Sequence, residues 1–190
     1  MQKSIEKIIV DIIKHELNLP ENYGTTSNND VIPSVIIYSQ NIKLFNTNKL
    51  QVTVKTVSQR VWSNRNYTKE DEKGNFIEIQ DLNESRMMQV DVYSRNNDAR
   101  DRFWEVQTAL NSVYAQQQMD LYNFKLSNIS SAQNISGIDG SSDINRFSIT
   151  FTALTHQEKV KSVDYYDKFK TTYNDESGQI AEINVPASEE

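Results

Sequence analysis

The sequence predicts an α+β fold in which two amphipathic helices flank a mostly antiparallel β-sheet with a long projecting hairpin. Apolar residues recur at helical spacing near residues 5–17 and 98–117. Apolar and polar residues alternate at 50–55, 87–93 and 146–153, as in strands with one buried face. The strand at 87–93 leads directly into the second helix, and this unit forms the predicted core.

Composition limits the class of protein. The chain has 190 residues, 37% of them hydrophobic, with nine Tyr, seven Phe and two Trp, which is enough for one domain with an aromatic-containing core. A net charge of -6 disfavours a dedicated nucleic-acid binder, which needs a basic face. The absence of cysteine excludes disulfides and thiolate chemistry and favours the cytosol or a redox-indifferent setting. We expect no signal peptide and no membrane-spanning helix.

The first helix has the clearest pattern. Isoleucines recur at i, i+3, i+4 and i+7 from Ile5 to Leu17, and charged residues fill the other face. Ser4 or Gln2 is suited to begin this helix, and Pro20 ends it. The periodicity predicts a helix packed on a sheet, and a helix facing another subunit is the alternative. A short strand follows at 34–38.

A long β-hairpin is predicted from residues 50–67 and 76–93, which are joined by the charged connection 68–75. We expect its base to lie in the core sheet, its tip to project, and its second strand to break near residues 81–85. Large aromatic side chains supply much of the energy at interfaces, so those around the hairpin are the predicted contact residues: Trp62, Tyr67 and Phe76. An ordinary solvated hairpin is the alternative.

The second helix, at 98–117, is predicted to begin at Asn96 or Asn97, with Asp98 and Asp101 at the positive end of its dipole. Two strands follow, at 121–129 and 146–153.

After residue 156 the composition becomes polar. We predict one domain at 1–156 and an extension at 157–190, in which 163–173 pairs with 179–185 as a peripheral hairpin and 186–190 forms a loose acidic tail.

The sequence contains no recognisable metal or catalytic motif. His15 and His156 are the only histidines, and His15 lies where it can interact with the C-terminal end of the first helix. The spacing Asp139-x-Ser141-x-Asp143 resembles the start of a calcium loop, but Ile144 and Thr150 replace the required Gly and Glu. We predict no metal and no cofactor.

Acidic residues give little support for catalysis. Glu70-Asp71-Glu72-Lys73 is expected to be a solvated turn. Asp91 is assigned to the polar face of a strand, and Asp98 and Asp101 to the first turn of a helix. No residue is therefore predicted to be catalytic, and the protein is predicted not to be an enzyme.

Three local sequences carry a resemblance to a known family. They are Ile36-Ile37-Tyr38-Ser39-Gln40-Asn41 followed by Leu50-Gln51-Val52-Thr53-Val54, Met88-Gln89-Val90-Asp91-Val92-Tyr93 leading into Asp98-Ala99-Arg100-Asp101, and Arg146-Phe147-Ser148-Ile149-Thr150-Phe151. Together they resemble the neck or tail terminator (tail-completion) proteins of tailed bacteriophages. The resemblance covers roughly residues 1–156, and the C-terminal region departs from the short members of the family.

The resemblance implies a structural virion protein, assembled in the host cytoplasm. Subunits of that family form a homo-oligomeric ring, commonly a hexamer, that joins the tail tube to the head-side connector. The long hairpin would then contact neighbouring subunits or rings. Genomic DNA would pass through the channel only as cargo, and an acidic protein repels phosphates instead of gripping them.

Two other functions remain open from the sequence. One is a metal-dependent nuclease or another carboxylate enzyme, which predicts acidic residues that converge in a pocket with perturbed pKa values. The other is a cytosolic adaptor that binds a host protein through the hairpin.

Overall fold

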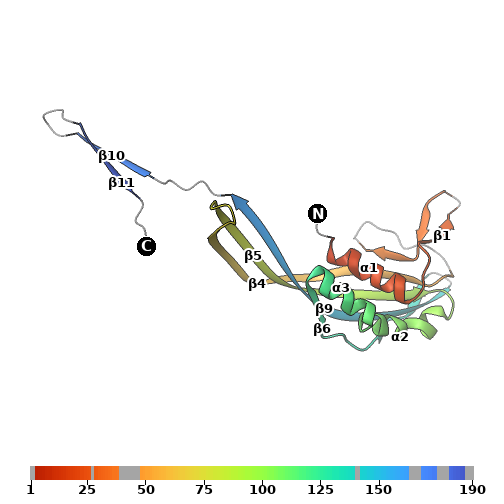
Figure 1. Ribbon diagram of the computed structural model, residues 1–190. Helices are drawn as coiled ribbons and strands as arrows, with labels where there is room; N and C mark the ends of the chain where they lie inside the picture. Colours follow the sequence, from red (N-terminus) through yellow and green to blue (C-terminus); the bar gives the residue numbers. More distant parts are fainter. Residues whose placement is uncertain are drawn as a thin grey trace. The chain divides into compact units, whose positions relative to one another are not determined.

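The computed structural model has the predicted fold class, α+β with mostly antiparallel strands (Figure 1). It describes residues 3–26, 28–38, 48–139, 142–162, 168–174 and 180–186. The chain forms two compact units. The first unit contains Met1–Asn64 and Leu82–Gln157, and the second unit contains Arg65–Asp81 and Glu158–Glu190. The second unit thus includes Arg65–Asp81 in addition to the C-terminal extension that the sequence suggests.

Three helices lie on one face of the sheet in the first unit (Figure 1). They are α1 (Ile5–Glu16), α2 (Asp98–Leu110) and α3 (Val113–Tyr122). The side chain of Ser4 caps α1 by accepting a hydrogen bond from the Lys7 backbone N–H. Ser4 is therefore the start of the helix, as the first of the two predicted alternatives has it. None of the described helices has both the length and the apolar character needed to span a bilayer.

The prediction of one helix over residues 98–117 is wrong. The Oγ atom of Ser112 accepts a hydrogen bond from the Ala115 backbone N–H at 3.0 Å and begins a new helix, α3. This helix continues to Tyr122 and ends at Asn123, whose φ of 50° is left-handed, a conformation that Asn tolerates. The strand predicted from residue 121 therefore begins only at Phe124.

The main sheet has the strand order β3-β4-β5-β9-β6. Its long strands are β4 (Gln51–Glu70), β5 (Phe76–Ser94) and β9 (Ser142–Ser162). The predicted break near residues 81–85 is wrong, because β5 runs through this segment. Its polar side chains, Glu84 above all, are held by hydrogen bonds within the sheet.

Shorter strands complete the sheet. β3 (Val35–Ile37) pairs in parallel with β4, and β6 (Phe124–Ser127) pairs antiparallel with β9. β7 (Gln133–Asn134) and β8 (Gly137–Asp139) also pair with β9. The sequence did not predict β1 (Asn22–Thr25) and β2 (Val31–Pro33), which form a separate two-stranded sheet.

The core of the first unit lies between the helices and the sheet. Five isoleucines of α1 are at most 5% exposed and pack with apolar residues of β4, β5 and β9. Burying each of these side chains contributes about 1.5–3 kcal/mol. From α2, Phe103 stacks on Phe147 of β9 with ring centroids 4.5 Å apart. The turn before α2 is closed by Ser94, whose Oγ accepts from the Ala99 backbone N–H at 2.9 Å, while Asn97 provides no side-chain cap.

Part of the second unit is a further two-stranded sheet. β10 (Lys168–Asn174) pairs antiparallel with β11 (Ile180–Pro186), and the register joins Lys168 to Pro186 and Asn174 to Ile180. The described backbone pairs these two strands only with each other. The connection 175–179 and the predicted acidic tail at 187–190 lie outside the described residues.

Candidate functional site

The three predicted contact residues are all exposed. Trp62 is 61% exposed, Tyr67 43% and Phe76 42%. Trp62 belongs to the first unit, whereas Tyr67 and Phe76 belong to the second, so they do not form one surface within a single unit. Trp62 is therefore the predicted residue whose surroundings in the first unit can be described.

An open hollow of about 390 Å³ lies beside Trp62. Apolar side chains line part of it, namely Trp62, Met119, Phe124 and Leu154, and polar residues such as Asp120, Lys125 and His156 line the rest. An exposed aromatic residue beside an apolar hollow with a polar rim is the usual composition of a protein contact surface.

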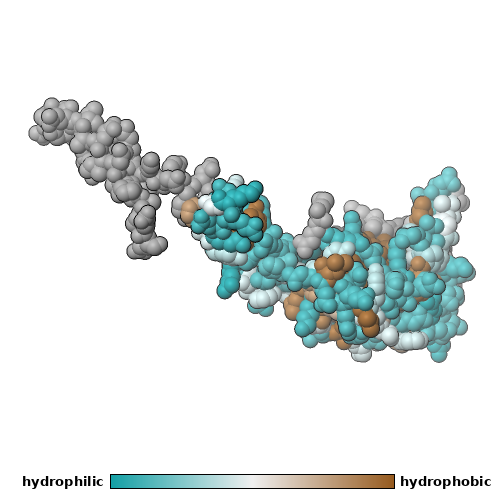
Figure 2. All heavy atoms as spheres, viewed as in Figure 1, coloured by the Kyte–Doolittle hydropathy of each residue, from teal (hydrophilic) through white to brown (hydrophobic). Residues whose placement is uncertain are grey.

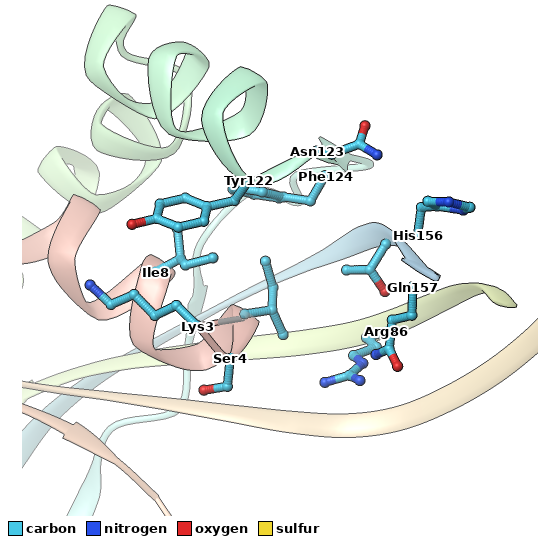
Figure 3. Close-up of a pocket in the computed structure, with 11 residues that line it drawn as sticks. Lys3, Ser4, Ile8, Arg86, Tyr122, Asn123, Phe124, His156 and Gln157 are labelled. Atoms are coloured by element: carbon cyan, nitrogen blue, oxygen red, sulfur yellow. The ribbon is translucent and has the colours of Figure 1, made fainter. Parts of the chain in front are cut away.

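A second hollow, of about 290 Å³, also borders the corner between α3 and β6 and shares Asn123, Phe124, Thr155 and His156 with the first (Figure 3). Its lining residues come from the start of α1, from β5, from β9 and from this corner. Figure 3 shows Lys3, Arg86 and Gln157 among them. Both cations are occupied: Lys3 binds Asp11, and Arg86 binds Glu84 at 2.5 Å. The second hollow thus offers no free positive charge from these two residues.

Glu84 is the centre of a buried polar network in the first unit. Its side chain is fully buried and accepts hydrogen bonds from Arg86 at 2.7 Å, from Thr155 at 3.1 Å, from Gln157 at 3.2 Å and from Gln59. Such complete satisfaction is what allows a carboxylate to be buried. The network ties β4, β5 and β9 together at the end of the apolar core.

Glu6 extends this network to α1. Its Oε1 atom lies 3.7 Å from the Arg86 guanidinium and accepts a hydrogen bond from the Thr56 hydroxyl at 2.6 Å. Burial raises the pKa of Glu6, but the hydrogen bonds from Thr56 and from its own backbone N–H, with the charge of Arg86, hold it below its ordinary value of 4.5. Glu6 is thus ionised at neutral pH and links the helix to the sheet.

Asp91 is buried on β5, where the sequence predicts a polar strand face. It forms a salt bridge of 2.6 Å with Arg146 and accepts a hydrogen bond of 2.6 Å from Gln89. Burial raises the pKa of Asp91, but hydrogen bonds from Gln89, Arg146 and Ser148 outweigh it and hold the pKa below the ordinary value of 3.8. Nearby, Tyr93 is buried and donates a hydrogen bond of 2.7 Å to Gln51, and burial raises the pKa of Tyr93.

The other acidic residues that were weighed as catalytic candidates lie at a helix start or in a turn. Asp98 and Asp101 lie in the first turn of α2, as predicted. The predicted connection 68–75 is shorter in the structure, because β4 continues to Glu70. Asp71 holds the turn that follows, since its Oδ1 atom accepts from the backbone N–H groups of Lys73 and Asn75, each at 2.8 Å. Of the loop that resembles a calcium site, Gly140 and Ser141 lie outside the described residues.

The two histidines contact an aromatic ring and an amide side chain. His15 lies in the last turn of α1, as predicted, and stacks on Tyr114 with ring centroids 3.8 Å apart. The Nδ1 atom of His156 lies 3.0 Å from the Asn83 Oδ1 atom.

The helices present further exposed apolar residues, namely Trp104, Val113 and Leu121. Figure 2 shows the hydrophobic groups on this side of the first unit separated by hydrophilic residues. A scattered arrangement of this kind is normal for a protein surface.

Sequence reasoning did not find Glu84 and Arg146 as structural residues. Their partners are distant in the sequence: Asp91 lies 55 positions from Arg146, and Glu84 lies 71 positions from Thr155. The one available signal was the set of polar residues that interrupts an otherwise apolar strand pattern.

No protein-family model matches the sequence, and no curated protein matches it.

Proposed function

We propose that the protein is a structural virion subunit of a tailed bacteriophage. In this proposal it forms a ring at the neck or the end of the tail and joins the tail tube to the head-side connector. The resemblance of residues 1–156 to tail terminator proteins supplies the specific class. The physical support comes from the exposed part of β4.

The exposure of β4 beyond the helices is the observation that carries the proposal. Residues 51–54 are buried, but the strand then continues with Val57 at 50%, Val61 at 47% and Trp62 at 61% exposure. A long strand that keeps large apolar side chains in solvent is a candidate surface for another protein chain. A subunit that completes its burial by assembly accounts for this exposure.

The buried carboxylates agree with a structural role. Glu84 and Asp91 are the two fully buried acidic residues in the part of the chain for which burial is described, and each is paired with an arginine. Paired in this way, they stabilise the contacts between strands. The net charge of -6 also suits a channel through which DNA passes without being held.

An assembly experiment with a matched control tests the proposal. The double substitution Trp62→Ala and Tyr67→Ala removes two exposed aromatics and should leave the fold intact but reduce ring formation on tail tubes or connectors at least tenfold. Trp104→Ala is the control, because Trp104 is similarly exposed, at 55%, but lies on α2. Electron microscopy and light scattering after chromatography measure the rings.

Two results would contradict the proposal. One is wild-type protein that stays monomeric and never assembles with tail or connector components. The other is a double variant that assembles normally while its thermal unfolding is unchanged, since this would leave the exposed aromatics of the β4–β5 pair without a role in assembly.

A further inference from the structure

α3 carries the two most exposed large apolar side chains of the described chain. Val113 is 70% exposed and Leu121 is 69% exposed. Gln117 lies halfway between them, and this spacing of four residues places all three side chains on one face of the helix. Apolar residues scattered singly over a surface need no explanation, but two on one face of one helix are a candidate contact surface.

The exposed face of α3, formed by Val113, Gln117, Asp120 and Leu121, has little charge. Asp120 is the one charged residue of this helix, whereas α1 and α2 each contain five residues that are Asp, Glu, Lys or Arg. Depletion of charge around apolar side chains distinguishes the centre of a protein contact from the rest of a surface.

This face is self-complementary. Val113 lies four positions before Gln117, and Leu121 lies four positions after it. Two α3 helices packed antiparallel about Gln117 therefore place Val113 of each copy against Leu121 of the other. The two Gln117 amides then meet at the centre, and each has a donor and an acceptor for the other. A contact between identical surfaces requires such a match.

Asp120 favours the antiparallel arrangement of two α3 helices. It lies in the last turn of its own helix, where the negative end of the helix dipole disfavours an acid, and that turn contains no basic residue. Within the described chain Asp120 forms no salt bridge. An antiparallel second helix brings its positive N-terminal end to Asp120, whereas a parallel one would bring the two carboxylates together.

We propose that two copies of the chain form a symmetric dimer through the exposed face of α3, with the helices antiparallel and the two-fold axis at Gln117. Each helix has only ten residues, so the contact is smaller than a standard interface and the dimer is weak. A contact of this symmetry closes with two copies and does not extend into a ring. The inference therefore goes beyond the proposed function and does not depend on it.

The substitution Gln117→Cys tests the position of the two-fold axis. The chain has no cysteine, so the full-length variant carries a single thiol. Packed helices have axes about 8–10 Å apart, which brings two thiols on the axis within reach of a disulfide. We expect a covalent dimer under mild oxidation. Thr108→Cys, on the exposed surface of α2, is the control and should give only background cross-linking.

The substitutions Val113→Lys and Leu121→Glu test which residues meet at the two ends. Either one alone places a charge against an apolar side chain at both ends of the dimer and should raise the dissociation constant about tenfold. In an equal mixture, the new lysine of one copy faces the new glutamate of the other, and the second end keeps Leu121 against Val113. The mixture should therefore form heterodimers. Analytical ultracentrifugation measures the dimers, and circular dichroism checks each fold.

Three results would overturn the dimer. One is Gln117→Cys protein that cross-links no more than the Thr108→Cys control. Another is a mixture of Val113→Lys and Leu121→Glu proteins that associates no better than either protein alone. The third is Val113→Lys protein that no longer forms rings on tail components, since α3 would then contact those components or a ring neighbour. Rings at the wild-type level from this variant, together with a weakened dimer, support both the dimer and the separate ring contact.

Discussion

The two parts of β4 in the first unit have the same strand conformation but opposite surroundings. Val52 and Val54 are fully buried beneath the helices, whereas Val57 and Val61 are 50% and 47% exposed. The sequence keeps valines in both parts, so composition alone does not distinguish them. The comparison shows that helix cover is not required for β4 to continue as a strand, and pairing with β5 is enough.

A polar network marks the boundary between these two parts. Thr56 and Gln59 of β4 reach Glu6 and Glu84, and Arg86 joins the two carboxylates. On one side of this network the strand contributes to stability, and on the other it is available for contact. The following predictions test that division, beginning with the largest expected effect.

Removing a core side chain above the buried part of β4 should cause the largest loss in the free energy of unfolding. Ile12 is fully buried, and Ile12→Ala should lower the free energy of unfolding by about 4 kcal/mol, through lost burial and the cavity left behind. Val61→Ala, on the exposed part of β4, should cost less than about 0.5 kcal/mol. Urea denaturation followed by circular dichroism measures both. Similar losses for the two variants would remove the distinction between the two parts.

Removing Arg86, the cation of the polar network at the boundary, should cause the next largest loss in the free energy of unfolding. Arg86→Met leaves the buried Glu84 carboxylate without its ionic partner and should lower the free energy of unfolding by about 3 kcal/mol. Adding Glu84→Gln removes the unpaired charge and should recover part of the loss. Independent, additive effects of the two substitutions in a double-mutant cycle would show that the pair does not act as a unit.

Acidification should weaken the polar network at the boundary, and it should lower the free energy of unfolding less than the two preceding substitutions do. The pKa of Glu6 is lower in the folded chain than its ordinary value of 4.5, so the unfolded chain binds more protons once the pH falls below about 4.5. The contribution of Glu6 is therefore complete above that pH and is lost as the pH falls through the folded pKa.

The matched variant for this effect is Glu6→Gln. It lacks the titration, so the stability difference between wild type and variant should shrink between about pH 6 and about pH 3. Other carboxylates with lowered pKa values, such as Asp91, titrate in both proteins and cancel from the difference. A difference that stays constant with pH would contradict the assignment.

Local patterns explain how much of the fold could be predicted. The isoleucines of α1 and the alternation around Phe147, Ile149 and Phe151 report burial through spacing alone, and both elements were predicted. The break at Ser112 was missed because a helix start within a helical pattern depends on one hydroxyl group. The continuity of β5 was missed because polar residues such as Glu84 read as a break unless their partners are known.

The candidate contact surface could be predicted only in part. The exposure of Trp62 follows from its position beyond the apolar run of β4, and the sequence indicated it. The hollow beside it could not be predicted, because α3, β6 and β9 bring together residues from distant parts of the chain. The lack of a described strand beside residues 56–64 of β4, on the side away from β5, is likewise invisible in sequence, since it depends on where β3 ends.

The central position of β5 has a consequence for synthesis of the chain. β5 lies between β4 and β9, and the partners of its buried acids, Arg146 and Thr155, arrive with β9. Until β9 leaves the ribosome, a nascent chain keeps one side of β5 unpaired and its two carboxylates without these partners. Folding of the first unit therefore finishes late in translation, and chains that stop before residue 142 should be substrates for chaperones and proteases.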